Sequence, residues 1–180
     1  QKESLKIPFI SSKFFEAEVE SDASNKTASD FIYVASADLH KNHINLIKAW
    51  ILLSKENIYP SLSFTLNIKE FNNLIENNFH WNEIFNLRIY NIEENKAYNI
   101  EQIFRKGKAL IFPSIIESFG LPLIEAKKLG MPIIAAELDY VRDIIDPDFT
   151  FDPNSPKSIA RAVKRFLKIN LKYDEPISSS

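Results

Sequence analysis

The sequence has 180 residues, of which 45% are hydrophobic, so it is long enough and apolar enough to fold around one core. Its formal net charge of −2 excludes the basic surface that holds a nucleic-acid backbone, and its lack of cysteine excludes disulfides and Cys-based zinc or redox sites. No apolar run approaches the roughly 18 residues of a membrane-spanning helix, so we expect no transmembrane segment.

The first half of the chain alternates short apolar runs with helical patterns. Residues 30–37 form an apolar, β-branched run that predicts a strand, and residues 42–57 then show helical spacing with Trp50 on the core side. The elements expected next are a strand over 61–68, a helix with a loop over 69–85, a strand over 87–92 and a short helix over 99–107 closed by Gly107.

The second half has clearer boundaries. The expected elements are strands over 109–114, 131–137 and 149–152, and helices over 120–130, 138–145 and 155–170. Pro122 lies in the first turn of the helix over 120–130, and Gly130 follows its end. Because nearly continuous apolar strands alternate with helices, the predicted fold is a Rossmann-like α/β domain, with a parallel sheet covered by helices on both faces.

Two strand-to-helix junctions carry unusual polar residues, the first over residues 35–43 and the second over residues 113–120. In a parallel sheet, ligands bind at such junctions. In the second junction we expect Glu117 at the rim of a cleft and Gly120 at the start of the helix, where a ligand can approach the backbone closely. Free N–H groups in the first helical turn attract phosphate. Glu125, one turn further, is a strong acceptor for ribose hydroxyls. Together these features outline a sugar-nucleotide site. The alternative is that Glu125 is an ordinary surface residue and Gly120 a turn glycine.

The run from Phe112 to Ile134, FPSIIESFGLPLIEAKKLGMPII, closely resembles the E-x7-E motif of retaining glycosyltransferases of the GT-B fold, family 4, in their C-terminal donor-binding domain. The matching positions are Pro113, Ser114, Glu117, Phe119, Gly120, Leu121, Pro122, Glu125, Ala126, Gly130 and Pro132. The resemblance implies that Glu117 contacts the donor sugar and acts in catalysis, and that Glu125 binds the nucleotide ribose. The donor-binding residues that it implies around the sugar and diphosphate are Ser118, Phe119, Gly120 and Leu121.

The first junction resembles the strand, loop and helix of the same family, in which a lysine just before the helix binds the diphosphate. Lys41 matches that lysine and His40 lies beside it. The helix dipole disfavours a lysine at this end unless an anion is bound nearby. The resemblance implies that Lys41 is catalytic, and the position of His40 near the phosphate loop predicts that it binds the donor by hydrogen bonding. A solvated loop lysine is the alternative. His40 and His43 invite a metal site, but no carboxylate or third histidine stands at a suitable spacing, so no metal site is predicted.

The chain departs from the family pattern in places. Many members carry Gly-Arg after the first strand, and this chain has Ala35, Ser36 and Ala37 there instead. Lys41 then either works with helix N–H groups alone or shares the phosphate with Arg142 or another cation. Further departures are Asn91 in place of a frequent glycine and Asp143 in place of a glutamate.

The resemblance also implies a domain arrangement. Residues 1–29 are expected to form a hinge or linker from an acceptor-binding N-terminal domain that this chain lacks, residues 30–170 the nucleotide-sugar-binding domain, and residues 171–180 a C-terminal tail. The full protein would transfer a glycosyl unit from a nucleotide-diphosphate sugar, without metal or other cofactor, to an acceptor sugar or lipid-linked glycan in polysaccharide or glycolipid assembly. The isolated fragment would be largely inactive.

Other functions stay open at this point. One is a non-catalytic sugar-nucleotide-binding subunit, and another is a GT-B-fold sugar-nucleotide epimerase or hydrolase. In each case the expected partner is a nucleotide sugar rather than a nucleic acid. The expected location is the cytoplasm, with peripheral attachment to the inner face of the membrane as a variant.

Overall fold

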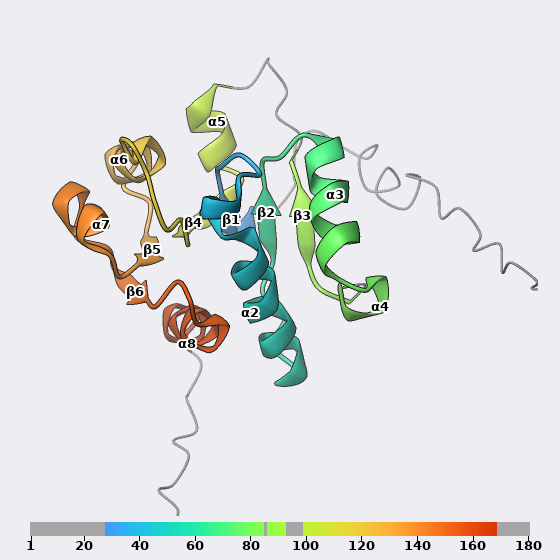
Figure 1. The fold of residues 1–180 in the computed structure, drawn as a ribbon. Helices are drawn as coiled ribbons and strands as arrows, with labels where there is room; N and C mark the ends of the chain where they lie inside the picture. Colours follow the sequence, from blue (N-terminus) through green and yellow to red (C-terminus); the bar gives the residue numbers. More distant parts are fainter. Residues whose placement is uncertain (1–27, 85, 93–98, 169–180) are drawn as a thin grey trace, which may run out of the picture.

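The computed structural model describes residues 28–84, 86–92 and 99–168. Six parallel strands form one sheet in the order β3-β2-β1-β4-β5-β6 (Figure 1). The strands are β1 (Ser29–Tyr33), β2 (Leu62–Phe64), β3 (Ile89–Asn91), β4 (Gly107–Phe112), β5 (Ile133–Ala136) and β6 (Phe149–Phe151). The predicted Rossmann-like parallel sheet is therefore confirmed.

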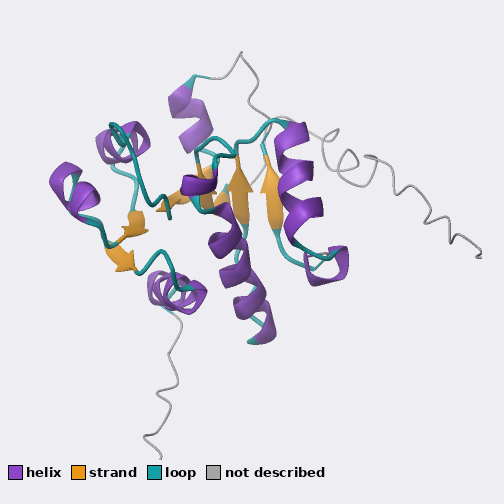
Figure 2. Cartoon of the chain, in the orientation of Figure 1, coloured by secondary structure: helices purple, strands orange, loops and turns teal. Residues whose placement is uncertain are grey.

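Helices connect the strands and cover the sheet (Figure 2). They are the 3-10 helix η1 (Leu39–Lys41) and the α-helices α2 (His43–Lys55), α3 (Ile68–Asn78), α4 (Trp81–Ile84), α5 (Ile100–Phe104), α6 (Leu121–Lys128), α7 (Asp139–Ile144) and α8 (Pro156–Phe166). Because the chain runs from β1 outward through β2 and then crosses back to β4, right-handed connections put α2 and α3 on one face and α5, α6 and α7 on the other. α8 returns to pack against α2.

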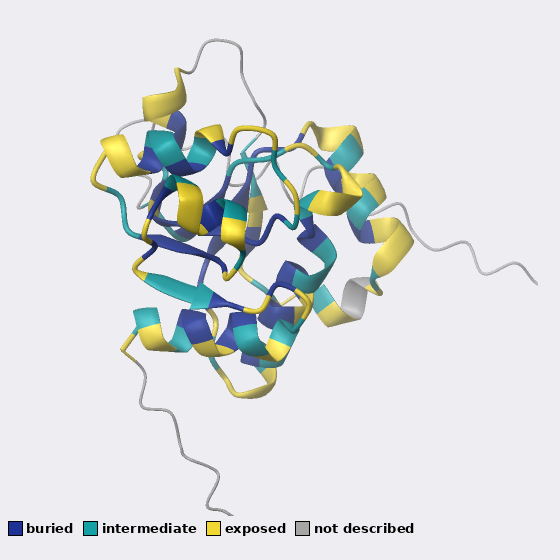
Figure 3. Ribbon diagram, turned by 60° about the vertical axis from the view of Figure 1, so that its left-hand side comes forward, coloured by how far each residue is buried: buried dark blue, intermediate teal, exposed yellow. Residues whose placement is uncertain are grey.

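The core lies between the central strands and these helices, where Figure 3 colours the buried residues dark blue. The side chain of Phe31 in β1 packs edge-on against Trp50 of α2, with ring centroids 5.5 Å apart, and its ring centroid lies 5.3 Å from that of Phe166 of α8. Trp50 is 1% exposed and its indole N–H donates to the Pro60 carbonyl oxygen. The predicted core role of Trp50 is confirmed, and α2 and α8 share one face of the sheet.

Several of the predicted elements were too long. The strand expected over 61–68 is reduced to β2, because after it the backbone of Leu66 is bonded by the Asn91 side chain, whose amide oxygen accepts from the Leu66 N–H and whose amide nitrogen donates to the Leu66 carbonyl. The helical region over 69–85 consists of α3 and α4 with a break between them.

The role predicted for Gly107 was wrong. Helix α5 ends at Phe104, and Gly107 instead begins β4, two residues before the expected start of that strand. A Cβ atom at Gly107 would lie 2.5 Å from Cγ2 of Ile32, so the glycine is required by the close approach of β4 to β1.

Most of the two predicted terminal segments lies outside the described residues. Of the hinge segment over 1–29, the structure describes 28 and 29, and Ser29 already belongs to β1. The tail over 171–180 is not described. Within the ranges that the structure does describe, no helix is both long and apolar enough to cross a membrane.

Candidate functional site

The site lies where the direction of the chain through the sheet reverses. β1 pairs with β2 on one side and with β4 on the other, so the loops that follow β1 and β4 meet at the carboxyl edge of the sheet. Such a reversal point leaves a crevice between the two loops, and this is where open α/β sheets bind ligands. A cavity of about 420 Å³ opens there, lined by His40, Lys41, Ile116, Glu117, Ser118, Phe119, Gly120, Leu121 and Pro122.

Seven of the eight predicted site residues line this one cavity. They are His40, Lys41, Glu117, Ser118, Phe119, Gly120 and Leu121. Glu125 does not line it: this residue is half-buried on α6, one turn beyond the cavity wall. The two glutamates of the motif therefore do not meet in the cavity, and they would contact different parts of a ligand.

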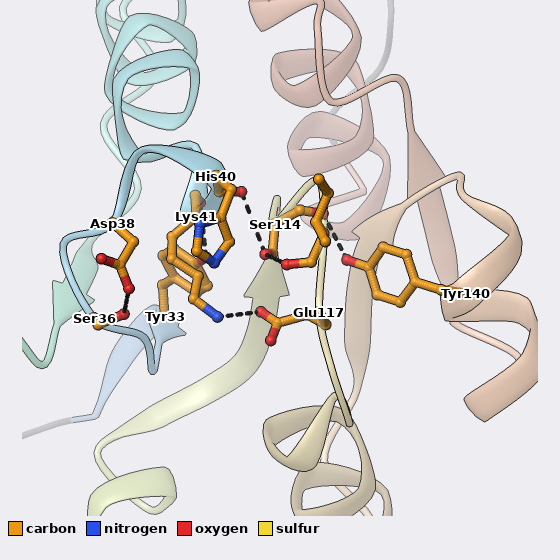
Figure 4. Close-up of polar contacts among 9 residues, drawn as sticks. Tyr33, Ser36, Asp38, His40, Lys41, Ser114, Glu117 and Tyr140 are labelled. Carbon is orange, nitrogen blue, oxygen red and sulfur yellow. Dashed lines mark hydrogen bonds and ion pairs between the residues drawn. The ribbon is translucent and has the colours of Figure 1, made fainter.

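The central contact of the cavity is an ion pair between its two charged residues. Lys41 Nζ lies 2.6 Å from Glu117 Oε1, although 76 positions separate the two residues in the sequence (Figure 4). Their side chains are 15% and 11% exposed, so both charges are mostly withdrawn from water. The electrostatic attraction between two charges this close and this shielded from water is stronger than that of an ion pair on the open surface.

The backbone on the Lys41 side is fixed by hydrogen bonds to neighbouring elements. The Tyr33 hydroxyl donates to the Lys41 carbonyl oxygen at 2.7 Å, and the Ile115 N–H donates to the His40 carbonyl oxygen at 2.8 Å. Tyr33 is fully buried, and burial together with the negative charge of Glu117 raises its pKa well above the usual range. The hydroxyl therefore keeps its proton and remains a donor to Lys41.

The backbone on the Glu117 side is fixed by Ser114 and Tyr140. The Ser114 hydroxyl donates to the carbonyl oxygen of Ile116 at 3.1 Å. The Tyr140 hydroxyl, from α7, donates to the Ser114 carbonyl oxygen at 2.6 Å (Figure 4). Burial, and then the charge of Glu117, raise the pKa of Tyr140 to about 12, so this donor also stays protonated.

Asn42 joins the two loops to a third. Its backbone is left-handed, with φ of 63°, and its buried side-chain amide donates to the carbonyl oxygens of Pro113 at 3.1 Å and Pro153 at 2.8 Å. Its own side-chain oxygen accepts from Asn45. Asparagine tolerates the left-handed region, and here its side chain satisfies carbonyl groups that would otherwise be buried without a partner.

The start of α6 forms one wall of the cavity. Gly120 is the N-cap with φ of 58°, and a Cβ atom there would lie 2.5 Å from Cδ1 of Ile144. The left-handed conformation therefore favours a glycine at this position, whereas the flexible end of the Ile144 side chain could move away from an added methyl group. Pro122 stands in the first turn, where its missing N–H removes no intrahelical bond. The glycine and the proline of the motif thus let a helix begin directly at the cavity.

His43 is buried and does not line the cavity. It is 3% exposed, its ring centroid lies 4.9 Å from that of Tyr33, and its Nε2 has no hydrogen-bond partner within the described ranges. Burial, and secondarily the charge of Lys41, lower the pKa of His43 to about 4, so the ring is neutral at neutral pH. Across the described part of the chain, no three His, Asp, Glu or Cys side chains gather as a metal ion would require.

The structure does not place Arg142 in the cavity, where it was considered as a second phosphate ligand beside Lys41. Its guanidinium binds the carboxylates of Glu137 and Asp146. Its charge is therefore already balanced. In the part of the junction where the family often has arginine, the Ser36 hydroxyl donates to Asp38 instead. Among the described residues that line the cavity, Lys41 alone carries a fixed positive charge.

Sequence reasoning missed the residues that hold the cavity in shape, namely Tyr33, Asn42 and Tyr140. Each donates a side-chain hydrogen bond to a backbone carbonyl oxygen of a loop around the cavity, and no spacing in the sequence reveals such a bond. Ser114 was noted as a matching position, without this role.

Comparison with known proteins agrees with the geometry. The family "Glycosyl transferases group 1" matches residues 14–179. The serotype-specific mannosyltransferase WbdA of Escherichia coli is 27% identical over 161 residues, which cover 88% of this chain and 20% of WbdA. The O-antigen chain mannosyltransferase RfbU of Salmonella typhimurium is 24% identical over 135 residues, covering 61% of this chain and 38% of RfbU. The chain thus spans about a fifth to two fifths of these relatives.

Solved structures show the same fold. A glycosyltransferase from Rickettsia africae superposes with a TM-score of 0.65 at 18% identity, over 89% of this chain and 43% of that one. The C-terminal domain of the glycosyl transferase group 1 family protein LpcC from Francisella tularensis superposes with a TM-score of 0.60 at 20% identity, over 77% of this chain and 75% of that one. With a family match over nearly its whole length and this fold, the chain belongs to the glycosyl transferases group 1 family, as a C-terminal domain of the GT-B type.

Proposed function

We propose that this chain is the donor-binding domain of a retaining glycosyltransferase that takes its glycosyl unit from a nucleotide-diphosphate sugar. The observation that carries the proposal is the meeting of Lys41 and Glu117 in one cavity at the reversal point of the sheet. A lysine ammonium suits a diphosphate, and a carboxylate accepts hydrogen bonds from sugar hydroxyls. The cavity therefore offers a cation to the diphosphate of a nucleotide sugar and a hydrogen-bond acceptor to its sugar.

Each predicted site residue has a defined role in this proposal. Lys41 binds the diphosphate and balances the negative charge that grows on it as the glycosidic bond breaks. The positive end of the α6 dipole assists it, so the transfer needs no metal ion or other cofactor. Glu117 orients the sugar, and His40 adds a hydrogen bond to the donor. The residues from Ser118 to Leu121 face the sugar and diphosphate, and Glu125 receives the ribose hydroxyls outside the cavity.

The acceptor is bound by a part of the protein outside this chain. The relatives with mannosyltransferase names are far longer than the region matched, and their names place two of them in O-antigen or serotype-specific synthesis. By analogy, the full protein transfers a hexosyl unit to a growing surface polysaccharide or glycolipid, on the cytoplasmic side of the membrane. This chain by itself would bind donor and transfer little or nothing.

A thermal titration of the 180-residue chain tests the proposal. UDP, GDP and ADP would be titrated, each beside a sugar conjugate: UDP-glucose, GDP-mannose and ADP-glucose. A ligand present at about 100 times its dissociation constant adds about 2.7 kcal/mol to the free energy of unfolding. Lys41→Ala should remove about 2 kcal/mol of that gain, because it deletes a charge-assisted contact to the diphosphate. Lys48→Ala, which deletes an exposed lysine on α2, is the matched control and should keep the full gain.

Glu125→Ala extends the same titration to the ribose. If Glu125 receives ribose hydroxyls, this variant weakens the binding of the nucleoside diphosphate and of its sugar conjugate by the same factor. The proposal is abandoned if none of the six ligands stabilises the parent chain, or if Lys41→Ala responds like the parent.

A further inference from the structure

Within the cavity, Lys41 has an anionic partner of its own. Its Nζ lies 2.6 Å from Glu117 Oε1, and the two side chains are 15% and 11% exposed. Among the described residues lining the cavity it is the one fixed cation. A diphosphate that enters must therefore compete with the Glu117 carboxylate for the same ammonium group.

The backbone on both sides of the pair is held in place. The Lys41 carbonyl oxygen accepts from Tyr33, and the loop before Glu117 is bonded to His40 through the Ile115 N–H. Ser114, next to that loop, is itself held by Tyr140. Because the two loops are tied to each other and to the sheet, they cannot easily move apart, and only the two side chains can give way to a ligand.

If Lys41 leaves Glu117 to bind a diphosphate, the Glu117 carboxylate loses its ion-pair partner, which is unfavourable. A carboxylate that is 11% exposed loses its partner and then faces a second anion in the same cavity. If Lys41 instead bridges both groups, two anions share one cation, and their mutual repulsion still weakens binding. A bound sugar changes this balance, because its hydroxyls donate hydrogen bonds to the carboxylate that the lysine has left.

We infer that Glu117 makes the cavity discriminate against a bare nucleoside diphosphate and in favour of the nucleotide that still carries its sugar. The inference rests on the proposed function. It assigns Glu117 a role in specificity besides its contact with the sugar: the carboxylate weakens the hold on the product once the glycosyl unit has left. Release of the spent nucleotide is thereby favoured by a charge that lies inside the binding site.

Isothermal titration of the parent chain and of Glu117→Gln tests this inference. The ligands are the nucleoside diphosphate and its sugar conjugate from whichever of the pairs UDP and UDP-glucose, GDP and GDP-mannose, or ADP and ADP-glucose binds the parent. Glutamine keeps the shape and the acceptor oxygen but removes the charge. We expect it to bind the bare diphosphate about tenfold more tightly than the parent does, with the preference for the sugar conjugate reduced about tenfold. Glu117→Ala, as a second variant, should also bind the bare diphosphate more tightly.

The control is Glu56→Gln, which removes the same charge from an ion pair with Lys164 at the opposite end of α2. It should leave both affinities unchanged. Equal or weaker binding of the bare diphosphate by both Glu117 variants would overturn the inference while leaving the donor site standing. A parent chain that binds neither member of any pair would instead overturn the proposed function, and the inference with it.

Discussion

Gly107→Ala is expected to lower the free energy of unfolding by about 3 kcal/mol, at the upper end of what overpacking of a core costs. The added methyl group would lie 2.5 Å from Cγ2 and 2.6 Å from Cβ of Ile32, and 3.2 Å from the Ile32 backbone nitrogen. Ile32 is fully buried in β1, the central strand, so it cannot turn away without disturbing the sheet. The strands β1 and β4 would be pushed apart. The loops that line the cavity directly follow these strands, so they would move as well.

Chemical denaturation of the parent and the variant measures this loss. Gly130→Ala is the control, because its φ of 66° favours glycine while nothing lies within 4 Å of the added Cβ atom, so it measures the cost of conformation without a close contact. It should cost about 1 kcal/mol, from backbone strain alone. If the two variants lost equal stability, the close approach of β4 to Ile32 would not be what requires glycine at Gly107.

The sequence allowed the central sheet to be predicted because its strands are buried on both faces. β4 and β5 consist almost wholly of buried apolar residues, so their pattern is a continuous run that does not depend on distant partners. The start of α6 was also readable, since a first-turn proline directly after the motif glycine is a local signal of a helix N-terminus. Both features depend on residues that are near one another in the chain.

The edges of the elements could not be predicted in the same way. β2 is only three residues long, because the Asn91 side chain, 25 positions away, takes the backbone groups of Leu66. Gly107 was mistaken for the end of a helix because a terminal glycine and a glycine forced by a neighbouring strand look alike in one sequence. The neighbour, Ile32, is 75 positions earlier and becomes relevant only once β1 and β4 are known to pair.

The candidate site was predictable in its residues but not in its contacts. The two strand-to-helix junctions suggested Glu117 and Lys41 separately, and the sheet order then brings the two side chains within 2.6 Å of each other. The tyrosines that fix their loops could not be found this way, since Tyr33 looked like one more apolar strand residue. Arg142 was considered for its charge alone, and only the structure shows that two carboxylates already bind it.

The buried histidine is expected to make the fold sensitive to mild acid. In the unfolded chain His43 takes up a proton as the pH falls through about 6.5, whereas in the folded chain its pKa is lowered to about 4. Between these values the unfolded state binds the extra proton, so the stability is full above about 6.5 and is lost as the pH falls toward 4. The loss is about 3 kcal/mol in total, and about 2 kcal/mol of it occurs by pH 5.

Denaturation at pH 7.5 and at pH 5 measures this loss, and His43→Phe should remove it. Phenylalanine can keep the packing against Tyr33 and Phe64, and it also removes the Nε2 atom that has no partner in the described structure. His40→Gln, which changes the exposed histidine of the cavity, is the control and should keep the pH dependence of the parent. If His43→Phe lost as much stability as the parent between the two pH values, carboxylates elsewhere would account for the acid sensitivity. If it lost about 2 kcal/mol less, the acid sensitivity would be assigned to His43, whose buried ring is neutral in the folded chain at neutral pH.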